Sequence, residues 1–499
     1  MRLCDLLSGE ERLENAGADI DITSLTADSR MVSAGTLFAA LPGSNVDGAR
    51  FVPAAVSAGA VAVLASGAAD LSVPPGVALI RSDDPRRSWS RISAMAYAPQ
   101  PEHVVAVTGT NGKTSVAVFL SQIWSALGHP AASIGTLGVV CERGNRTVAP
   151  PEGVPDVKLT SPDPVVLHQA LRGLGAGGYS HVAIEASSHG LEQRRVDGVE
   201  LEAGAFTNIT RDHLDYHVSF ENYLAAKLRL FEVLLAPGKL AVVNCDGPGH
   251  EAAMAVASSC GLKLMTHGRK TGDVRLANVQ SRPAGLDIEI KYGGQSWPVS
   301  LGLVGGFQAE NAATALCLAT ASGISVADSI SVLGALRGAR GRLEPVGNTF
   351  SGAVAYVDFA HTPDALKTAL AALRPHVSGR IITVFGAGGD RDPGKRPLMG
   401  AAAAAGSDAV IVTDDNPRSE DPGAIRAAVL VGCPEGVEIG DRAEAIAAAL
   451  SQAGDGDAVL VAGKGHETGQ TICGVVHPFS DHDVIADVLA GAFASGGHP

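Results

Sequence analysis

The C-terminal third of the chain has the most regular hydrophobic pattern. Four continuous apolar runs, at residues 353–359, 381–387, 408–415 and 457–463, alternate with stretches in which apolar residues have helical spacing. Apolar strands that alternate with helices predict βαβ units and a mostly parallel sheet. We therefore expect an α/β fold, with a Rossmann-like domain in this part of the chain.

The central part of the chain predicts a second sheet. An apolar strand is expected at residues 103–107, and further strands at 181–185, 204–208 and 239–244. Between residues 273 and 306 the apolar residues recur at every second position, which indicates a small antiparallel element. The central domain is therefore expected to have a mostly parallel sheet and a small antiparallel addition.

Two boundaries divide the chain into three predicted domains. Pro99 and Pro101 mark a linker after a first block that contains a helical pattern and a buried strand. The Gly- and Arg-rich stretch 337–345 indicates a second hinge, with a solvated surface loop as an equal alternative. A length of 499 residues also agrees with about three domains. The predicted domains are residues 1–98, 99–338 and 339–499.

Composition and charge exclude several classes of protein. Hydrophobic residues make up 46% and charged residues 18%, so the chain is not a disordered one. A net charge of −14 argues against binding of nucleic acid or of an anionic membrane, because such binding surfaces are basic. We expect no signal peptide and no transmembrane helix, since no apolar stretch is long enough. The seven cysteines are scattered without a CxxC pair, which favours a reducing cytoplasm.

A phosphate-binding loop is predicted between residues 108 and 115. The strand that ends at Val107 is followed by a Gly-rich turn and a helical pattern, so backbone N–H groups and a helix N-terminus would face an anion. Lys113 would reach the terminal phosphates and Thr114 would bind Mg²⁺. Val107 stands where the strict G-x-x-x-x-G-K-[ST] pattern has its first glycine. The predicted nucleotide-binding residues are Gly109, Thr110, Asn111, Gly112, Lys113, Thr114 and Ser115.

Two more residues of the central domain are candidates for chemistry. Glu185 ends a predicted strand and would complete a Mg²⁺ site, with a surface carboxylate as the alternative. Lys227 lies on the apolar face of a helix expected over 219–234, together with Phe220, Tyr223 and Phe231. An inward lysine either extends its stem to water or is partly neutral and reacts with CO₂ to give a carbamate suited to Mg²⁺. The residues alone leave both interpretations open.

Polar residues follow each predicted strand of the C-terminal domain. Asp358 and His361 follow the first strand, and polar stretches at 390–396, 414–421 and 464–467 follow the others. Ligands of parallel α/β sheets lie beyond the carboxyl ends of the strands. We therefore expect one shared ligand site at that edge of the sheet.

Eight sequence motifs occur in a fixed order along the chain. They are TGTNGKTS (108–115), EASSHGL (185–191), TNITRDHLDYH (207–217), YLAAKLRLF (223–231), FAHTPD (359–364), GGDRDPGKRP (388–397), DNPRSEDP (415–422) and GKGHE (463–467). With this set the chain resembles the Mur ligase family, and the resemblance covers essentially its whole length.

The resemblance implies an ATP-dependent amide ligase of peptidoglycan precursor synthesis. ATP would phosphorylate a carboxylate of UDP-N-acetylmuramoyl-L-alanyl-D-glutamate, and an amine of 2,6-diaminopimelate would attack the acyl phosphate. ATP would be the co-substrate and Mg²⁺ the cofactor. Arg418 would hold the distal carboxylate of diaminopimelate, with a pair to Glu420 or Asp421 as the alternative.

The resemblance also implies roles for single residues. The catalytic residues would be Lys113, Glu185, His213, Lys227 and Arg342. The Mg²⁺ ligands would be Thr114, Glu185, His213 and Lys227 as its carbamate. Asn311, Asp358 and His361 would join the phosphate loop in binding ATP. The UDP-linked dipeptide would contact Ser29, Ser44, Thr160, Ser161, Ser187, Gln193 and Arg195. Diaminopimelate would contact Arg391, Asp415, Asn416, Pro417, Arg418, Gly463 and Glu467.

Three alternative functions have different signatures in the sequence. A lysine-adding relative would differ mainly at Arg418. A folylpolyglutamate-synthetase-like ligase would lack the DNPRSEDP motif and would need no UDP site. A catalytically silent nucleotide-binding regulator would have no need of Lys113, Glu185, His213 and Lys227, all of which are present.

Overall fold

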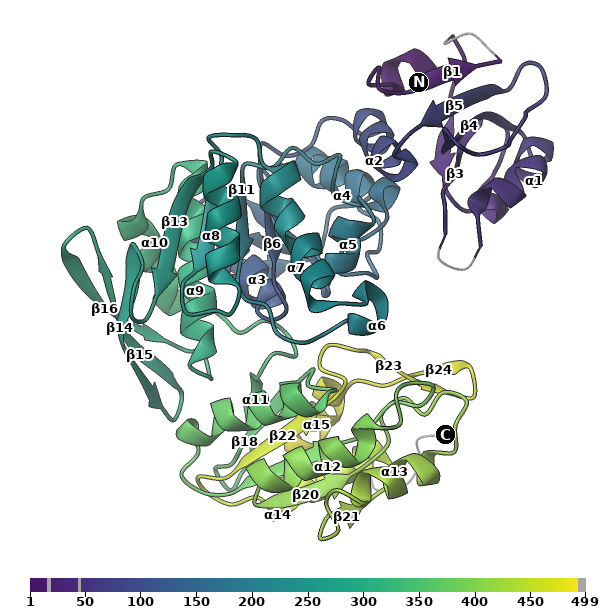
Figure 1. The fold of residues 1–499 in the computed structure, drawn as a ribbon. Coiled ribbons are helices and arrows are strands. Elements are labelled where there is room, and N and C mark those ends of the chain that lie inside the picture. The colour runs from purple at the N-terminus through teal and green to yellow at the C-terminus, as the bar shows by residue number, and fades with distance from the viewer. Residues whose placement is uncertain (16–18, 44–45, 492–499) are drawn as a thin grey trace. The chain divides into compact units, whose positions relative to one another are not determined.

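The computed structural model describes residues 1–15, 19–43 and 46–491. The chain forms two compact units, and Figure 1 labels their helices and strands. Unit 1 comprises Met1–Val274 and Ala313–Ser329, and unit 2 comprises Arg275–Ala312 and Ile330–Pro499. Both contain sheets covered by helices, which confirms the expected α/β class. The bounds of the three domains given above stay a prediction.

A small sheet forms at the start of unit 1. Its elements are β1 (Arg12–Glu14), β2 (Ser24–Thr26), β3 (Thr36–Ala40), α1 (Val52–Ser57), β4 (Ala60–Ser66), β5 (Ala78–Ser82) and α2 (Pro85–Ala96). The strand order is β1-β5-β4-β3-β2. Neighbouring residues of β4 point to opposite faces, so Leu64 packs in one core with Trp89 of α2, whereas Val63 packs in another with Val52 of α1. The helix and buried strand expected in this block are confirmed.

The second sheet of unit 1 is mostly parallel. Its strands are β6 (His103–Thr108), β7 (Ala131–Gly135), β8 (Gly138–Arg143), β9 (Arg146–Val148), β10 (His181–Glu185), β11 (Ala203–Phe206), β12 (Leu240–Asn244) and β13 (Lys263–Gly268). Their order is β13-β12-β11-β6-β10-β7-β8-β9, with β8 antiparallel to β7 and β9. Val107 of β6 pairs with Glu185 of β10 and with Ala205 of β11. The carboxyl ends of these three strands therefore lie side by side.

The helices of this region differ in two places from the sequence prediction. They are α3 (Lys113–Ala126), α4 (Pro164–Ala176), α5 (Ser188–Glu192), α6 (Leu214–His217), α7 (Phe220–Arg229) and α8 (His250–Ser259). Helix α3 is buried all round rather than on one face, because it packs on the sheet while Trp124 on another side donates a hydrogen bond to Ser322. The helix expected over 219–234 changes to a π-helical turn at Leu230–Leu234. Phe220 is 39% exposed, so its place on the apolar face was wrong.

Unit 2 contains the antiparallel element that the alternating pattern predicted. Strands β14 (Val274–Arg282), β15 (Gly285–Tyr292) and β16 (Gln295–Leu301) pair antiparallel in sequence order. Two helices follow along the chain, α9 (Phe307–Ala319) and α10 (Val326–Val332).

The C-terminal sheet is parallel apart from its first strand. Its elements are β17 (Glu344–Asn348), β18 (Val354–Asp358), α11 (Pro363–Leu373), β19 (Ile381–Phe385), α12 (Lys395–Gly406), β20 (Ala409–Val412), α13 (Pro422–Leu430), β21 (Val437–Glu438), α14 (Arg442–Gln452), β22 (Ala458–Ala462), β23 (Gly469–Ile472), β24 (Val475–Pro478) and α15 (Asp481–Leu489). The strand order is β17-β18-β22-β19-β20-β21, and β23 and β24 form a separate hairpin.

Both faces of this sheet are buried, which explains the continuous apolar runs. Leu460 of β22 packs in one core with α11, α12 and α13, which cover one face (Figure 1). Val459 and Val461 pack on the opposite face with α14 and α15. The central parallel strands β19, β20 and β22 are therefore apolar at almost every position. The predicted βαβ arrangement is confirmed. None of the helices formed by the described residues has the length and apolar character of a membrane span.

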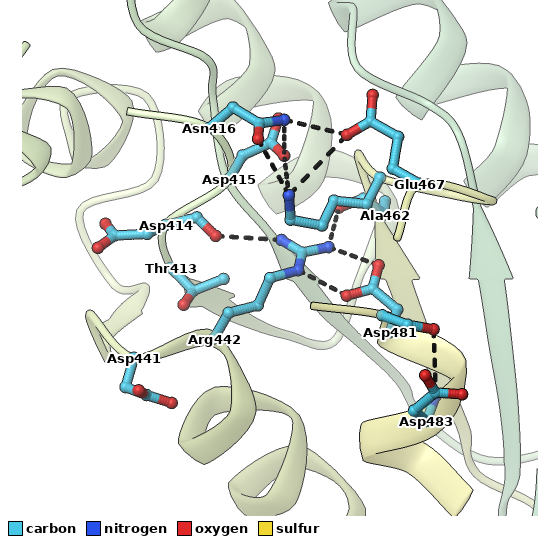
Figure 2. A network of polar contacts seen from close by, with 12 residues as sticks. Thr413, Asp414, Asp415, Asn416, Asp441, Arg442, Ala462, Glu467, Asp481 and Asp483 are labelled. Atoms are coloured by element: carbon cyan, nitrogen blue, oxygen red, sulfur yellow. Dashed lines mark hydrogen bonds and ion pairs between the residues drawn. The ribbon is translucent and has the colours of Figure 1, made fainter. Parts of the chain in front are cut away.

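A fully buried ion pair joins two helices to two strand ends in this unit (Figure 2). Arg442, at the start of α14, bonds both carboxylate oxygens of Asp481, at the start of α15, over 2.7 and 2.9 Å. Neither side chain is exposed. The same guanidinium donates to the carbonyl of Ala462 at 3.0 Å and to that of Asp414 at 3.4 Å. Arg442 thus ties the carboxyl ends of β20 and β22 to both helices.

Asp481→Ala is expected to destabilise unit 2 strongly. The change leaves the Arg442 guanidinium buried without its counter-ion, which costs about 3–5 kcal/mol of unfolding free energy. Denaturant unfolding followed by far-UV circular dichroism measures this loss of unfolding free energy. As a control, Glu289→Ala removes an ion pair with Lys291 that is more than a third exposed on both sides and leaves stability nearly unchanged. An equally small loss in Asp481→Ala would contradict the structural role of the pair.

Candidate active site

The phosphate loop lies between β6 and α3, as predicted. Gly109 and Gly112 have positive φ angles of 142° and 89°, which glycine adopts without strain. Lys113 folds back over the loop, and its Nζ donates to the carbonyls of Gly109 at 2.9 Å and Thr110 at 3.0 Å. The loop therefore places backbone N–H groups, the N-terminus of a 14-residue helix and a lysine around one point, which suits a polyphosphate.

Glu185 lies beside this loop at the end of β10. Its side chain is buried, and its Oε2 accepts a hydrogen bond from the Thr114 hydroxyl at 3.0 Å. Thr136, which follows β7, donates to the same carboxylate through its backbone N–H at 2.8 Å and its hydroxyl at 3.2 Å. Two of the predicted metal ligands, Thr114 and Glu185, are thus brought together. Thr136 was missed in the sequence, although it too follows the carboxyl end of a strand.

His213 is not joined to that pair. It precedes α6 with a positive φ of 51°, and its side chain is 47% exposed. Its ring lies 4.9 Å from the ring of His189 and 6.1 Å from that of Tyr223. Among the described residues, no group of three or more His, Cys, Asp or Glu side chains is arranged to hold a metal ion. The protein atoms in place are therefore one carboxylate and one hydroxyl, both oxygen donors of the kind that Mg²⁺ prefers.

Lys227 points inward, as the helical spacing predicted. It is 1% exposed, and its Nζ donates to the carbonyl of Gly109 at 2.8 Å. The amine also lies 4.6 Å from the centre of the Tyr223 ring, whose hydroxyl bonds Thr110 at 2.9 Å. Burial, and next the charge of Lys113, lowers the pKa of Lys227 well below its ordinary value. An amine with a lowered pKa therefore contacts the phosphate loop directly.

Five of the residues predicted to contact a dipeptide form a hydrogen-bonded network beside Glu185. Ser161 donates to the Glu185 carbonyl at 2.8 Å and accepts from the Ser187 N–H at 2.9 Å. Arg195 donates to the Ser161 carbonyl and to the Gln193 side chain, both at 2.7 Å. Thr160 bonds the Thr136 hydroxyl at 2.9 Å. Ser29 lies in a 3₁₀ turn of the first sheet region, and Ser44 falls outside the described residues.

In unit 2, the loops that follow the parallel strands meet at one edge of the sheet. Asn416, after β20, donates to Glu467, after β22, at 3.0 Å (Figure 2). Its carbonyl accepts from the N–H of Gly389, after β19, at 2.9 Å. Lys395 reaches the carbonyl of His361, after β18, at 3.0 Å. The shared edge predicted from the polar loops is thus formed, with Asp415 and Gly463 inside it and Arg391 on its exposed rim.

Arg418 is held by its backbone rather than by a carboxylate. Its φ is 54°, its N–H donates to Thr471 at 2.9 Å, and its carbonyl accepts from Cys473 at 2.6 Å. Its guanidinium donates to the carbonyl of Gly389 at 2.6 Å. Among the described residues it forms no ion pair, since Glu420 pairs with Arg396 at 2.8 Å and Asp421 caps α13. The turn is therefore fixed by the β23–β24 hairpin as well as by Pro417.

Three further predicted residues lie near the carboxyl end of β18. The Arg342 guanidinium stacks 4.9 Å from the centre of the Phe359 ring. Asp358 accepts hydrogen bonds from the N–H groups of Leu343 and Ala360, while burial raises its pKa. The His361 ring lies 4.6 Å from the Phe359 ring. Asn311, in α9, donates to Gln308 at 2.9 Å.

Family models match three consecutive parts of the chain. The catalytic domain of the Mur ligase family matches residues 21–122, the Mur ligase middle domain matches residues 107–319, and the Mur ligase glutamate ligase domain matches residues 341–465.

Similar proteins align over nearly the whole chain. The UDP-N-acetylmuramoyl-L-alanyl-D-glutamate–2,6-diaminopimelate ligase of Bradyrhizobium diazoefficiens is 48% identical over 499 residues, which is 99% of this chain and 100% of that protein. The ligase of the same name from Caulobacter vibrioides is 49% identical over 475 residues, or 95% and 96% of the two chains.

Solved structures give the same result for the fold. A UDP-N-acetylmuramoyl-L-alanyl-D-glutamate–2,6-diaminopimelate ligase has a TM-score of 0.68 at 34% identity and covers 94% of this chain and 95% of its own. Mycobacterium tuberculosis folylpolyglutamate synthase complexed with ADP has a TM-score of 0.61 at 18% identity, with 76% and 91% covered. At that identity the second likeness concerns the fold alone.

Gly109→Ala is expected to weaken Mg-ATP binding about 10-fold or more. An added Cβ would lie 2.0 Å from the Thr207 hydroxyl, and the φ of 142° is strained for any side chain, so the loop must shift. Calorimetric titration measures the Kd. In the control Gly175→Ala the nearest atom to the added Cβ is 3.8 Å away, and affinity stays unchanged. Equal nucleotide affinity in the two variants would rule out the predicted contact of this loop with phosphate.

Proposed function

The chain belongs to the Mur ligase family, and on this premise we propose that it joins 2,6-diaminopimelate to UDP-N-acetylmuramoyl-L-alanyl-D-glutamate at the expense of ATP. The observation that carries the proposal is the 48–49% identity to ligases of that name along almost the entire chain. The reaction belongs to the synthesis of a peptidoglycan precursor. Its partners are small molecules.

Each stage of this reaction has a set of residues suited to it. ATP transfers its γ-phosphoryl group to the free carboxylate of the dipeptide's D-glutamate, giving an acyl phosphate and ADP. An amine of diaminopimelate attacks the acyl carbon, and phosphate leaves as the amide forms. The phosphate loop and Lys113 stabilise negative charge on the transferred group. Thr114 and Glu185 would hold Mg²⁺, which neutralises phosphate charge when bound.

The network beside Glu185 supports a dipeptide site next to the transferred phosphoryl group. Ser161 is bonded to the Glu185 backbone, and Arg195 and Gln193 extend from Ser161. The guanidinium of Arg195 would bind a carboxylate of the dipeptide. The roles of Ser29, Thr160 and Ser187 rest on the family resemblance.

The loops of unit 2 support the amino-acid site. Asp415 and Glu467 supply carboxylates for an ammonium group, while the Arg418 fork suits a second carboxylate. Arg391, Asn416, Pro417 and Gly463 belong to the same loops. Arg342, Asp358, His361 and Asn311 are proposed for ATP.

Lys227 is proposed to act as a carbamate. Its amine is buried, has a lowered pKa and lies 2.8 Å from the Gly109 carbonyl. A neutral amine adds to CO₂ and loses a proton, so the side chain becomes a carboxylate within reach of the loop. With His213 it would complete the Mg²⁺ ligands. A cytoplasmic location is also proposed, supported by seven cysteines that are all free.

The proposed function is tested by phosphate release from the purified full-length chain. The assay contains ATP, Mg²⁺ and the UDP-linked dipeptide, with meso-diaminopimelate, LL-diaminopimelate or L-lysine added in turn. We expect release that depends on both the dipeptide and diaminopimelate. Preference for lysine would favour the lysine-adding relative, and nucleotide binding without release would favour the silent regulator.

Lys227→Ala is expected to lower turnover about 100-fold or more, because the carboxylate proposed to help hold Mg²⁺ beside the transferred phosphoryl group is lost. A small carboxylic acid in the buffer should restore part of the activity. Lys227→Arg should stay inactive, since guanidinium cannot be carbamylated. Steady-state phosphate release is the measurement, with the exposed Lys263→Ala as a control of unchanged activity. An active Lys227→Arg enzyme would eliminate the carbamate.

Arg418→Ala is expected to lower the ratio of kcat/KM for diaminopimelate to that for lysine by roughly 100-fold or more. A site that bonds a polar group discriminates strongly against an analogue that lacks it. The variant should lose most activity with diaminopimelate and gain little with lysine. Arg418→Lys should recover only part, because an ammonium lacks the two-donor fork. An unchanged ratio in Arg418→Ala would remove Arg418 from the specificity role.

A further inference from the structure

We propose that Lys464 is a positioning residue of the amino-acid site, which orients the amide of Asn416 and holds the carboxylates of Asp415 and Glu467 where they receive the substrate's ammonium group. This inference rests on the proposed function, because it concerns the same site. Lys464 has no role among the contacts proposed above for ATP, the dipeptide and diaminopimelate.

Lys464 is fully buried, and it lies among Asp415, Asn416 and Glu467. Its side chain is 0% exposed, so it acts on its neighbours and not on a substrate. Its Nζ donates to the carbonyl of Gly469 at 2.8 Å and to Oδ1 of Asn416 at 3.2 Å. It also lies 3.6 Å from Asp415 and 3.9 Å from Glu467. One ammonium group therefore connects the loop after β20 with the loop after β22.

The contacts of Lys464 determine which way the Asn416 amide faces. Oδ1 of Asn416 accepts from the Lys464 ammonium and from the N–H of Thr471, the latter at 2.9 Å. A flipped amide would set its NH₂ against two donors. Nδ2 is therefore directed away from Lys464, where it donates to Glu467 at 3.0 Å and to Asp415 at 3.3 Å. Lys464 thus acts on Glu467 both directly and through Asn416.

Lys464 also opposes protonation of Glu467. Burial raises the pKa of Glu467, and the negative charge of Asp415 raises it further, whereas Asn416, Lys464 and Arg418 lower it. Without Lys464, two like charges would remain close together in a buried site, which favours protonation of one of them. A protonated Glu467 cannot bind an ammonium group as an anion.

The contacts of Arg442 hold the ends of β20 and β22 independently of Lys464. Arg442 faces Lys464 from α14, but its charge is matched by Asp481. The guanidinium also holds the carbonyls of Asp414 and Ala462, where β20 and β22 end. The strand ends are therefore expected to stay in place when the Lys464 ammonium is removed. Only the side chains of Asp415, Asn416 and Glu467 then lose an interaction.

The test compares Lys464→Met with the exposed control Lys367→Met in full-length protein. Methionine keeps the unbranched stem and removes the charge. We expect the KM for diaminopimelate to rise about 10-fold or more, the loss that follows removal of a charge-assisted interaction. The KM values for ATP and for the UDP-linked dipeptide should stay near those of the control. The acidic limb of kcat/KM for diaminopimelate should move to higher pH, because Glu467 then protonates more readily.

Asn416→Asp gives an independent measurement, also if Lys464→Met does not fold. Aspartate keeps the acceptor for Lys464 and Thr471 but replaces the donor that faces Glu467 by an oxygen. The same rise in the KM for diaminopimelate and the same shift of the acidic limb are expected. A wild-type KM and acidic limb in either folded variant overturns the proposal, as does a KM increase shared by all three substrates. Wild-type protein without diaminopimelate-dependent turnover would instead overturn the proposed function.

Discussion

A lysine amine buried on the phosphate loop is the interaction on which this account depends. Lys227 is removed from water with a backbone carbonyl, that of Gly109, as its hydrogen-bond acceptor, and none of the described carboxylates forms an ion pair with it. Burial of the ammonium form, and next the charge of Lys113, therefore lower the pKa well below its ordinary value, and the charge of Asp212 opposes this only in part. Helix α7, the loop at Gly109 and the end of β6 must hold their places for this amine to stay buried and reactive.

A second buried lysine, Lys464, differs from Lys227 in having carboxylates beside its amine. Lys464 is as fully enclosed as Lys227, but Asp415 and Glu467 lie within 4 Å of its ammonium group. Burial lowers its pKa while both carboxylates raise it. The surroundings therefore suit the two proposed roles: an amine without an ion-pair partner suits the proposed reaction with CO₂, and an amine beside two carboxylates suits the proposed positioning of its neighbours. Both lysines lie where parallel strands end, so the sheet edge supplies backbone carbonyls and side chains in fixed positions.

The sequence predicted those parts whose signals are local. The strand 181–185, the phosphate loop and the inward direction of Lys227 each follow from spacing within one segment. Thr136 was missed, because its contact with Glu185 requires β7 to lie next to β10, which is a matter of strand order. Arg442 gave no signal either, since its partner Asp481 comes from another helix. Likewise, Phe220 has the spacing of a core residue but stands at the first residue of α7, beyond the core.

The central claim is that the buried Lys227 carries a carbamate. Carbon-13 NMR of the full-length protein, equilibrated with ¹³C-labelled bicarbonate, tests it directly, with Lys227→Met as the matched reference. The account predicts a carbamate resonance in the wild-type protein that is absent from the variant and that weakens as the pH is lowered, because acid returns the amine to its ammonium form. A wild-type spectrum identical to that of Lys227→Met, in protein that turns over diaminopimelate, would contradict it.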